Sequence, residues 1–334
     1  MTTLEVVGLT VRYGHGSTGL TAVEDVNLAI PPGGTLGLVG ESGCGKSTVA
    51  RAIVRLIPIA SGRLLLNGQD VAAAHGAFLR DFRRRVQMVF QDPYASLNPR
   101  MTVGDAIGEA IATYRNVSAP TLALEVARLL EMVGLDPRAV TNFPHQFSGG
   151  QRQRIAIARS LAVQPEILIC DEVTSSVDVS VQANILNLLK ELQKTLGLSY
   201  LFISHNLSVI RYMSDAVSVM YLGRVVEHAP AVELFARPRH PYTRVLIDSI
   251  PKVVSRVAAD RVHLSGDVPD PRDPPPGCRF HTRCPFGPLV HPDRVICRDI
   301  DPHTTVDAGA PMAACHFPLS GDVAGTSAAH GARP

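Results

Sequence analysis

The sequence has 334 residues, of which 46% are hydrophobic and 19% are charged. The length predicts about two domains, and the composition can bury a large core, which excludes a wholly disordered chain. The net charge is only +2. Nucleic acid is therefore not the first partner to expect, because proteins held by phosphate contacts usually carry a basic excess.

Nothing in the sequence predicts a membrane span or a secretion signal. The longest apolar runs fall well short of the ~20 residues that are needed to cross a bilayer. The first ten residues lack the basic region and apolar stretch that mark a signal peptide. We therefore expect a cytosolic chain whose membrane role, where it has one, comes through partners.

Strand-like and helix-like segments alternate over the first 235 residues. Short apolar or alternating runs predict strands at 6–13, 22–30, 35–39, 63–66, 85–90, 166–170, 200–203 and 216–221. Apolar residues at helical spacing predict a helix over 179–196, which Gly197 ends. Between about 92 and 164 no strand is evident, and periodicity at 102–114 and 121–133 indicates a helical insert. The predicted fold class is α/β, with a mainly parallel sheet covered on both faces.

The composition changes after residue 235. A helix-sized stretch over 242–250 precedes a proline-rich segment at 269–276 that cannot form a regular helix. The last residues are mostly small and polar, which predicts a disordered tail. The expected organisation is an α/β domain over 1–235, a C-terminal extension over 236–316 and the tail over 317–334.

A glycine-rich loop follows the strand predicted at 35–39 and precedes a helix-like segment. It reads Gly40-Glu41-Ser42-Gly43-Cys44-Gly45-Lys46-Ser47-Thr48 and fits the phosphate-loop pattern. Backbone N–H groups of such a loop surround phosphate oxygens, and the helix N-terminus favours negative charge. Lys46 is expected to reach the β- and γ-phosphates of a nucleotide, and Ser47 to ligate Mg²⁺. The alternative is a chance glycine turn, and Cys44 is interpreted as a small loop residue.

Two carboxylates follow the strand predicted at 166–170. Asp171 is expected to hold Mg²⁺, usually through water, and Glu172 to polarise the water that attacks the phosphate. Two adjacent acids can also be a solvated strand end, but ligands of parallel sheets bind at the carboxyl ends of strands. Together with the phosphate loop, this pair predicts hydrolysis of a nucleoside triphosphate.

A second anion-binding helix start lies ahead of this strand. Ser148-Gly149-Gly150-Gln151 opens a helix-like segment, and with it the sequence resembles the ATP-binding cassette (ABC) ATPases. The resemblance implies a RecA-like core, a small antiparallel β subdomain, and ATP and Mg²⁺ as ligands. It also implies that this motif faces the γ-phosphate held by an opposite subunit, so that two cassettes close over two ATP molecules.

Further residues match the family in order. The resemblance implies that Tyr13 stacks on adenine and that Asp178 communicates across the dimer. It also implies that Gln91 senses Mg²⁺ and the transport partner, and that His205 contacts the γ-phosphate. Glu172, Gln91 and His205 are thus the expected catalytic residues. The alternatives are a plain strand residue for Tyr13 and a polar cap for His205.

Longer matches narrow the resemblance to the ATP-binding subunits of oligopeptide and dipeptide permeases. They are the segments 91–99, 240–243 and 277–285, and residues 148–154 are more similar to the F-type than to the D-type subunit. The implied activity is ATP hydrolysis that powers a peptide importer at the cytoplasmic face of the inner membrane. The implied partners are a second, non-identical cassette, two integral membrane permease subunits and, indirectly, an extracytoplasmic substrate-binding protein.

Four of the six cysteines lie within 38 residues near the end of the chain: Cys278, Cys284, Cys297 and Cys315. In a reducing compartment, such a group suggests metal more readily than disulfides. Four thiolates can hold an iron–sulfur cluster or tetrahedral zinc, and the tight pairs of zinc ribbons are absent. The permease resemblance implies that some members bind a 4Fe–4S cluster here. We therefore expect that cluster, with zinc and no metal as alternatives.

Two other functions stay open on the sequence. A soluble cassette ATPase acting on DNA or ribosomes needs no membrane partner, but its relatives usually carry coiled-coil insertions or two cassettes. A non-hydrolytic module that only associates through ATP is disfavoured by Glu172 and His205. The one basic run, at 80–85, is interpreted as a solvated face leading into a strand, and no nucleic-acid partner is expected.

Overall fold

The computed structural model describes residues 3–14, 19–175, 177–250, 266–303 and 309–320. Most of the tail predicted to be disordered, 321–334, lies outside these residues. Its first four residues do not behave as a free tail. The backbone N–H of Leu319 donates to the carbonyl of Arg239 at 2.8 Å, and the Arg294 guanidinium lies 4.5 Å from the Phe317 ring centroid.

Two sheets form the framework of the described residues. A four-stranded antiparallel sheet has the order β2-β1-β4-β5, and a seven-stranded sheet has the order β11-β10-β9-β3-β8-β7-β6. In the larger sheet, β9, β3, β8, β7 and β6 run parallel, while β10 pairs antiparallel with both of its neighbours, β9 and β11. The strands are β1 (Leu4–Tyr13), β2 (Leu20–Ile30), β3 (Thr35–Val39), β4 (Ser61–Leu66), β5 (Gln69–Asp70), β6 (Val86–Val89), β7 (Ile167–Asp171), β8 (Ser199–Ile203), β9 (Ala216–Tyr221), β10 (Arg224–Pro230) and β11 (Met312–Ala313).

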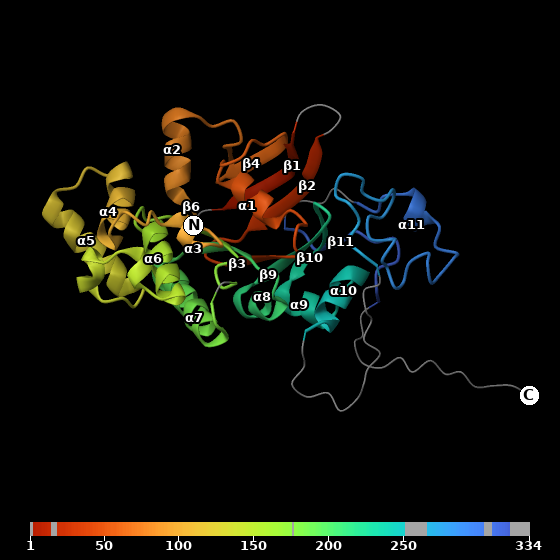
Figure 1. Ribbon diagram of the computed structural model, residues 1–334. Helices are drawn as coiled ribbons and strands as arrows, with labels where there is room; N and C mark the ends of the chain where they lie inside the picture. The colour runs from red at the N-terminus through yellow and green to blue at the C-terminus, as the bar shows by residue number, and fades with distance from the viewer. Residues whose placement is uncertain (1–2, 15–18, 176, 251–265, 304–308, 321–334) are drawn as a thin grey trace, which may run out of the picture.

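Helices cover the larger sheet and build a separate group at one end of the molecule (Figure 1). That group contains α4, α5 and α6, and the described residues between β6 and β7 form no strand. The α-helices are α1 (Lys46–Ile53), α2 (Gly76–Arg85), α3 (Pro93–Ser96), α4 (Val103–Tyr114), α5 (Ala119–Met132), α6 (Gly149–Leu161), α7 (Val179–Leu196), α8 (Leu207–Met213), α9 (Ala231–Ala236), α10 (Pro241–Asp248) and α11 (Ile296–Asp299). Two short 3₁₀ helices, η2 (Pro137–Thr141) and η3 (Pro144–Gln146), precede α6.

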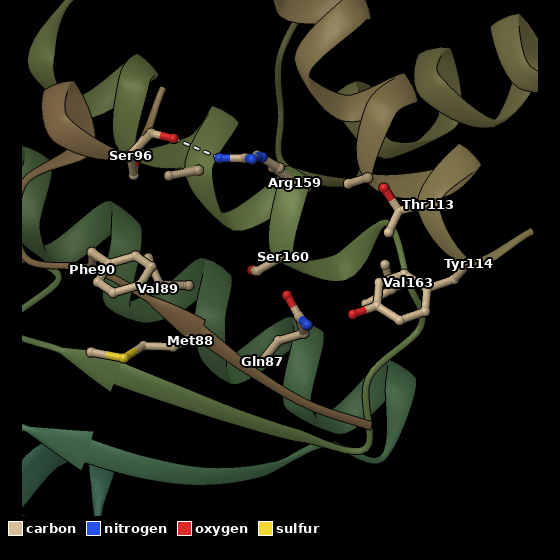
Figure 2. Close-up of a pocket in the computed structure, with 12 residues that line it drawn as sticks. Gln87, Met88, Val89, Phe90, Ser96, Thr113, Tyr114, Arg159, Ser160 and Val163 are labelled. Atoms are coloured by element: carbon tan, nitrogen blue, oxygen red, sulfur yellow. Dashed lines mark hydrogen bonds between the residues drawn. The ribbon is translucent and has the colours of Figure 1, made fainter. Parts of the chain in front are cut away.

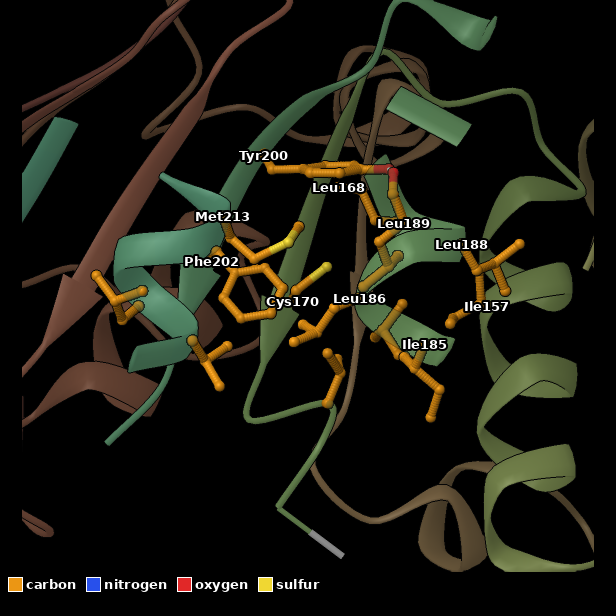
Figure 3. Close-up of a cluster of buried hydrophobic side chains, with 14 of the residues drawn as sticks. Ile157, Leu168, Cys170, Ile185, Leu186, Leu188, Leu189, Tyr200, Phe202 and Met213 are labelled. Atoms are coloured by element: carbon orange, nitrogen blue, oxygen red, sulfur yellow. The ribbon is translucent and has the colours of Figure 1, made fainter. Parts of the chain in front are cut away.

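The central strands are apolar on both faces, because each face packs against a different layer. Side chains alternate across a strand, so Leu168 and Cys170 of β7 join the cluster under α7, whereas Ile167 and Ile169 join the cluster that contains α1 and the antiparallel sheet. Figure 3 shows the first cluster, in which the apolar face of α7 packs on β7 and β8. The buried Tyr200 satisfies its hydroxyl by donating to the Leu189 carbonyl at 2.7 Å.

The fold confirms the predicted α/β class with its additional antiparallel sheet. The helix predicted over 179–196 and the strand over 216–221 have those bounds in the structure. The tight turn after β4 has Asn67 and Gly68 at φ of 52° and 79°, as expected of a two-residue hairpin turn. No helix in the described part of the chain combines the length and the apolar character that crossing a bilayer requires.

Several elements were not predicted. The basic run at 80–85 belongs to helix α2, and its four arginines all have partners; Arg84 pairs with Asp81 of the same helix at 3.2 Å. Arg83 donates to the Arg55 carbonyl at 2.7 Å, Arg80 donates to the Thr113 carbonyl, and Arg85 pairs with Glu166 at 2.6 Å. Strand β10 and helices α8 and α9 were also missed.

The C-terminal extension is attached to the α/β core at several points. Strand β11 adds to the edge of the larger sheet through Ala313 opposite Glu227 and Met312 opposite His228. Arg279 pairs with Glu24 on β2 and also donates to the Leu222 carbonyl. The extension is thus packed against the same sheet that carries the phosphate loop (Figure 1).

Candidate nucleotide site

The predicted site residues follow neighbouring parallel strands at one edge of the sheet. Gly40 follows β3, His205 comes after β8, Glu172 follows β7 and Gln91 comes after β6, and these four strands are adjacent in the order β3-β8-β7-β6. Because the carboxyl ends of parallel strands meet at the same edge, ligands bind there. The sheet order therefore brings together residues that are up to 165 positions apart.

Glycines shape the phosphate loop. A Cβ on Gly40 would stand 2.2 Å from the Met220 carbonyl oxygen, so a side chain is excluded there. Gly45 has a φ of +106°, and its Cβ would meet the Ala22 carbonyl oxygen at 2.7 Å. Gly43 also has a positive φ, +80°. A loop with these conformations turns its backbone N–H groups toward one side, as phosphate cradles require.

Lys46 is buried at the start of α1, with 5% of its surface exposed. Its ammonium donates to the carbonyls of Gly40 and Glu41, both at 2.8 Å, and lies 3.8 Å from the Cys44 sulfur. Burial raises the pKa of the Cys44 thiol, so Cys44 is a neutral packing residue of the loop. Ser42 and Gly43 lie between Glu41 and Cys44 in the same loop.

The residues expected to hold Mg²⁺ lie together. The Ser47 hydroxyl donates to the Asp171 carboxylate at 3.1 Å, which joins α1 to the end of β7. Burial raises the pKa of Asp171, and the hydrogen bond from Ser47 opposes that shift. Mg²⁺ takes oxygen ligands and completes its octahedron with waters and substrate phosphates. A hydroxyl and a carboxylate next to a phosphate loop therefore fit this ion.

Glu172 is the point where the expected catalytic residues meet. The Gln91 amide donates to one carboxylate oxygen at 2.8 Å, and His205 Nδ1 lies 3.2 Å from the other. Glu172 has a left-handed φ of 49°, which is uncommon for a non-glycine residue and typically found at functional sites. Its N–H donates to the Ile203 carbonyl at 3.0 Å, and its own carbonyl accepts from the Ser175 hydroxyl at 2.9 Å. These bonds hold the carboxylate in place.

The second predicted motif lies at the N-terminus of α6. The Ser148 hydroxyl accepts from the Gln151 N–H at 3.3 Å, and the Gln151 side chain accepts from the Ser148 N–H at 2.9 Å. This reciprocal pair is a capping box. Gly150 lies against α7, because a Cβ there would stand 2.3 Å from Val181 Cγ1. The starts of α6 and α7 are therefore neighbours, and both Ser148 and Asp178, which precedes α7, are exposed.

Among the residues that the structure describes, no hydrogen bond or ion pair joins the 148–151 motif or Asp178 to residues 40–48. Tyr13, in contrast, does lie beside the loop. It is 39% exposed, and its hydroxyl donates to the Thr48 hydroxyl at 3.5 Å. An exposed ring at this place is available for stacking.

The structure does not support the predicted iron–sulfur cluster or its zinc alternative. The four cysteines of the extension line one hollow, but its volume is about 10 Å³, which is space for roughly one water molecule. Burial raises the pKa of both Cys278 and Cys284 to about 12. In the described ranges, no three His, Cys, Asp or Glu side chains are arranged to hold a metal ion. The cysteine spacing alone could not show this, because burial in the extension is set by its packing on the core.

Two residues that hold the phosphate loop, Arg283 and Tyr242, were not predicted from the sequence. The Glu41 carboxylate accepts from Arg283, and the Glu41 N–H donates to the Tyr242 hydroxyl at 2.9 Å. Arg283 and Tyr242 fall inside two segments that match the permease ATPases. Their partner could not be found, because more than 200 residues separate each of them from Glu41.

Comparison with known proteins agrees with this geometry and defines the class first. The dimeric post-hydrolysis state of the ATP-binding cassette MJ0796 bound to ADP and phosphate is 28% identical, with a TM-score of 0.62 over 68% of this chain and 98% of that chain. The structure of cbiO1 from Clostridium perfringens, part of the transporter complex cbiONQ, has a TM-score of 0.63 at 28% identity over 70% and 90% of the two chains. Residues 23–175 match the ABC transporter family. The chain is an ATP-binding cassette ATPase.

The C-terminal part then specifies the branch of the family. Residues 226–288 match the oligopeptide/dipeptide transporter C-terminal region. The protein of Brucella abortus (strain 2308) that is named putative peptide import ATP-binding protein BAB2_1053 is 49% identical to this chain. The match covers 91% of this chain and 90% of the Brucella protein. The oligopeptide transport ATP-binding protein AppF of Bacillus subtilis (strain 168) is 46% identical over 89% of both chains. The chain belongs to the ABC transporter family, in the group with this C-terminal region.

Proposed function

We propose that this chain is the F-type ATP-hydrolysing subunit of a di- or oligopeptide importer. The observation that carries the proposal is the convergence of Gln91 and His205 on Glu172 beside a phosphate loop, in a chain that also carries the C-terminal region of peptide transporters. The proposed organisation is a nucleotide-binding domain over 1–235, with its helical insert at about 92–164, and an extension over 236–316.

The geometry supports a role for Glu172 as the group that orients the attacking water. Its side chain is 15% exposed, so a small part of it is open to solvent. Gln91 donates to one of its oxygens, and an acceptor-only carboxylate then keeps its other lone pairs for a water proton. His205 is 58% exposed and is thus free to donate to a phosphate oxygen when ATP is bound.

Lys46 and the glycine loop account for phosphate binding. In the structure the Lys46 ammonium donates to the carbonyls of Gly40 and Glu41 and, weakly, to the Cys44 sulfur at 3.8 Å. A phosphate oxygen would take the place of one of these acceptors when ATP binds. Ser47 and Asp171 would hold Mg²⁺, with Gln91 at its edge. When bound, the ion would neutralise charge on the β- and γ-phosphates.

A second cassette completes the site in this proposal. Ser148, Gln151 and Asp178 are exposed at neighbouring helix starts. Within the described part of the chain they make no hydrogen bond or ion pair with their own phosphate loop, which supports a role toward another subunit. The N-terminus of α6 favours an anion. The MJ0796 cassette is dimeric in its ADP-bound structure. The importer resemblance makes the partner of this chain a non-identical cassette.

A hollow next to Gln91 is the proposed docking place for a membrane permease subunit (Figure 2). It has a volume of about 270 Å³ and is lined by residues of β6, α4 and α6, including Phe90, Tyr114 and Arg159. Arg159 donates to the Ser96 carbonyl at 2.5 Å at its border. Because β6 leads directly into Gln91, a segment seated here would be linked to Glu172 through the Gln91 amide.

The remaining proposed partners follow from the importer function. They are two integral membrane permease subunits, which would hold this chain at the cytoplasmic face of the inner membrane, and an extracytoplasmic substrate-binding protein. The rival function on DNA or ribosomes has no supporting observation. The basic run of α2 is used in internal contacts, with Arg80, Arg83 and Arg85 all engaged.

Reconstituted transport tests the proposal. The complex that co-purifies with this chain is placed in vesicles with its binding protein, and uptake of labelled di- to pentapeptides is followed with and without ATP. We expect ATP-dependent peptide uptake that is lost in Lys46→Ala and retained in Glu131→Gln, which changes an exposed carboxylate of α5. ATP hydrolysis without uptake of any peptide would refute the peptide substrate. The absence of any co-purifying membrane chain would refute the importer.

A further inference from the structure

Glu41 of the phosphate loop is held by the C-terminal extension. The Arg283 guanidinium donates from Nη1 to Glu41 Oε2 at 2.8 Å and from Nη2 to Oε1 at 3.2 Å. This two-point arrangement fixes the orientation of the carboxylate as well as its position. The contact spans 242 residues of sequence.

The backbone of Glu41 is fixed by the extension too. Its N–H donates to the Tyr242 hydroxyl at 2.9 Å, while its carbonyl accepts from the Lys46 ammonium at 2.8 Å. One residue thus connects Arg283 and Tyr242 on one side with the phosphate-binding lysine on the other. A shift of Glu41 would move a carbonyl that holds Lys46.

Arg283 is itself rigidly placed. It is 6% exposed, and its Nη1 also lies 3.4 Å from the Tyr221 hydroxyl. Phe280 packs edge-on against the rings of Tyr221 and Tyr242, with centroids 5.2 and 5.3 Å away. Glu41 raises the pKa of Arg283, so the guanidinium stays charged. A charged group this deeply buried depends on its partner, because unpaired burial is costly.

We propose that Arg283 is a positioning residue for ATP binding, which acts through Glu41 to hold the phosphate loop and Lys46 ready for the nucleotide phosphates. The inference rests on the ATPase activity of the family and assigns the extension a direct part in it. A loop already held in its binding conformation loses less entropy when the ligand arrives. Loss of the Arg283 contact should therefore weaken ATP binding more than it slows hydrolysis by the fully bound enzyme.

The test is steady-state ATP hydrolysis by the assembled transporter, with KM and kcat measured separately, together with the equilibrium Kd for Mg-ATP. For Arg283→Met we expect KM and Kd to rise about tenfold, the effect of losing one charge-assisted hydrogen-bond pair, while kcat stays within about threefold. Arg283→Lys keeps the charge and one donor, so it should give a smaller rise.

Arg279→Met is the matched control. Arg279 lies in the same loop of the extension, is 13% exposed and anchors it to Glu24 and the Leu222 carbonyl without touching the phosphate loop. Its loss should lower the unfolding temperature as Arg283→Met does, but should leave the KM for ATP unchanged. Equal rises of KM in both variants would mean that the extension acts only through general stability, and would overturn the proposal.

Glu41→Gln supplies a second route if Arg283→Met does not fold. It removes the carboxylate charge with little change of shape, and it should raise KM by a similar factor. In the double variant with Arg283→Lys, the two effects should not add, because both changes weaken the same contact. Additive effects, or an unchanged KM in Glu41→Gln, would contradict the proposal. A wild-type complex that binds ATP but does not hydrolyse it would instead refute the ATPase function, while Kd would still test Arg283.

Discussion

The packing of the 148–151 motif explains why glycine is needed at position 150. A Cβ at this position would stand 2.3 Å from Val181 Cγ1 and 3.7 Å from its Cβ. A β-branched side chain near the start of a helix has few rotamers to escape to. Gly150→Ala should therefore force α6 and α7 apart, or strain Val181, at a cost of about 1–3 kcal/mol.

The second change tests whether Val181 is the cause. Val181 is half-buried, so Val181→Ala alone should cost about 1 kcal/mol. In the double variant the clash is gone, and alanine is a better helix former than glycine by up to about 1 kcal/mol. The variant with both changes should thus be at least as stable as Val181→Ala. Its loss of stability should be about 1–3 kcal/mol smaller than the sum of the losses in the two single variants.

Urea unfolding of the wild type, the two single variants and the double variant measures these free energies of unfolding. The midpoints are compared where the m-values are equal. ATP hydrolysis by the assembled complexes gives the second readout. If Gly150 is needed for packing, Val181→Ala should restore part of the activity that Gly150→Ala removes. The reasoning would be refuted if Gly150→Ala unfolded like the wild type, or if the double variant were no more stable than Gly150→Ala.

Three further predictions follow from single contacts. Lys46→Ala should weaken ATP binding about 100-fold, because a charged donor to phosphate is lost. Isothermal titration measures the affinity, and an unchanged affinity would contradict this role of Lys46. Asn206 caps α8 by accepting from the Ser208 N–H at 2.9 Å, so Asn206→Ala should cost about 1 kcal/mol in urea unfolding and Asn206→Asp nearly nothing. Burial lowers the pKa of His240 from 6.5 to about 3. Between pH 6.5 and pH 3 the unfolded chain therefore binds more protons at this residue than the folded chain does. The stability of the fold should fall as the pH drops through this range. From pH 6.5 to 4.5, the wild type should lose about 2 kcal/mol more than His240→Asn, whose side chain can still accept from Tyr242; equal losses would refute a neutral buried His240.

The sequence predicted the elements whose apolar pattern is strong. The helix over 179–196 has a continuous apolar face, and the strands around β7 and β8 are apolar runs, since they are covered on both sides. Strand β10 was missed because it carries Glu227 and His228, which are polar but buried. Helix α2 was missed because Phe82 is its only fully buried residue, so its pattern is dominated by arginine.

In the site, too, residues in a short sequence motif could be predicted, whereas contacts between residues far apart in the sequence could not. The phosphate loop and the acids after β7 could be predicted, because a short motif contains the groups that the chemistry needs. The contacts of Gln91 and His205 with Glu172 depend on the order of the strands, which the sequence implied only through the family resemblance. The Arg283 contact with Glu41 depends on how the extension packs, and no local pattern records it.

Hydrolysis by the Glu172→Gln variant tests the central claim most directly. Single-turnover ATP hydrolysis and ATP binding are measured on the same assembled complex, because the variant keeps the shape of the side chain but loses the carboxylate that would orient water. We predict that ATP still binds and that hydrolysis falls at least about 100-fold, which leaves ATP held in the complex. Hydrolysis at the wild-type rate would contradict a catalytic role for Glu172 and with it the account of this site.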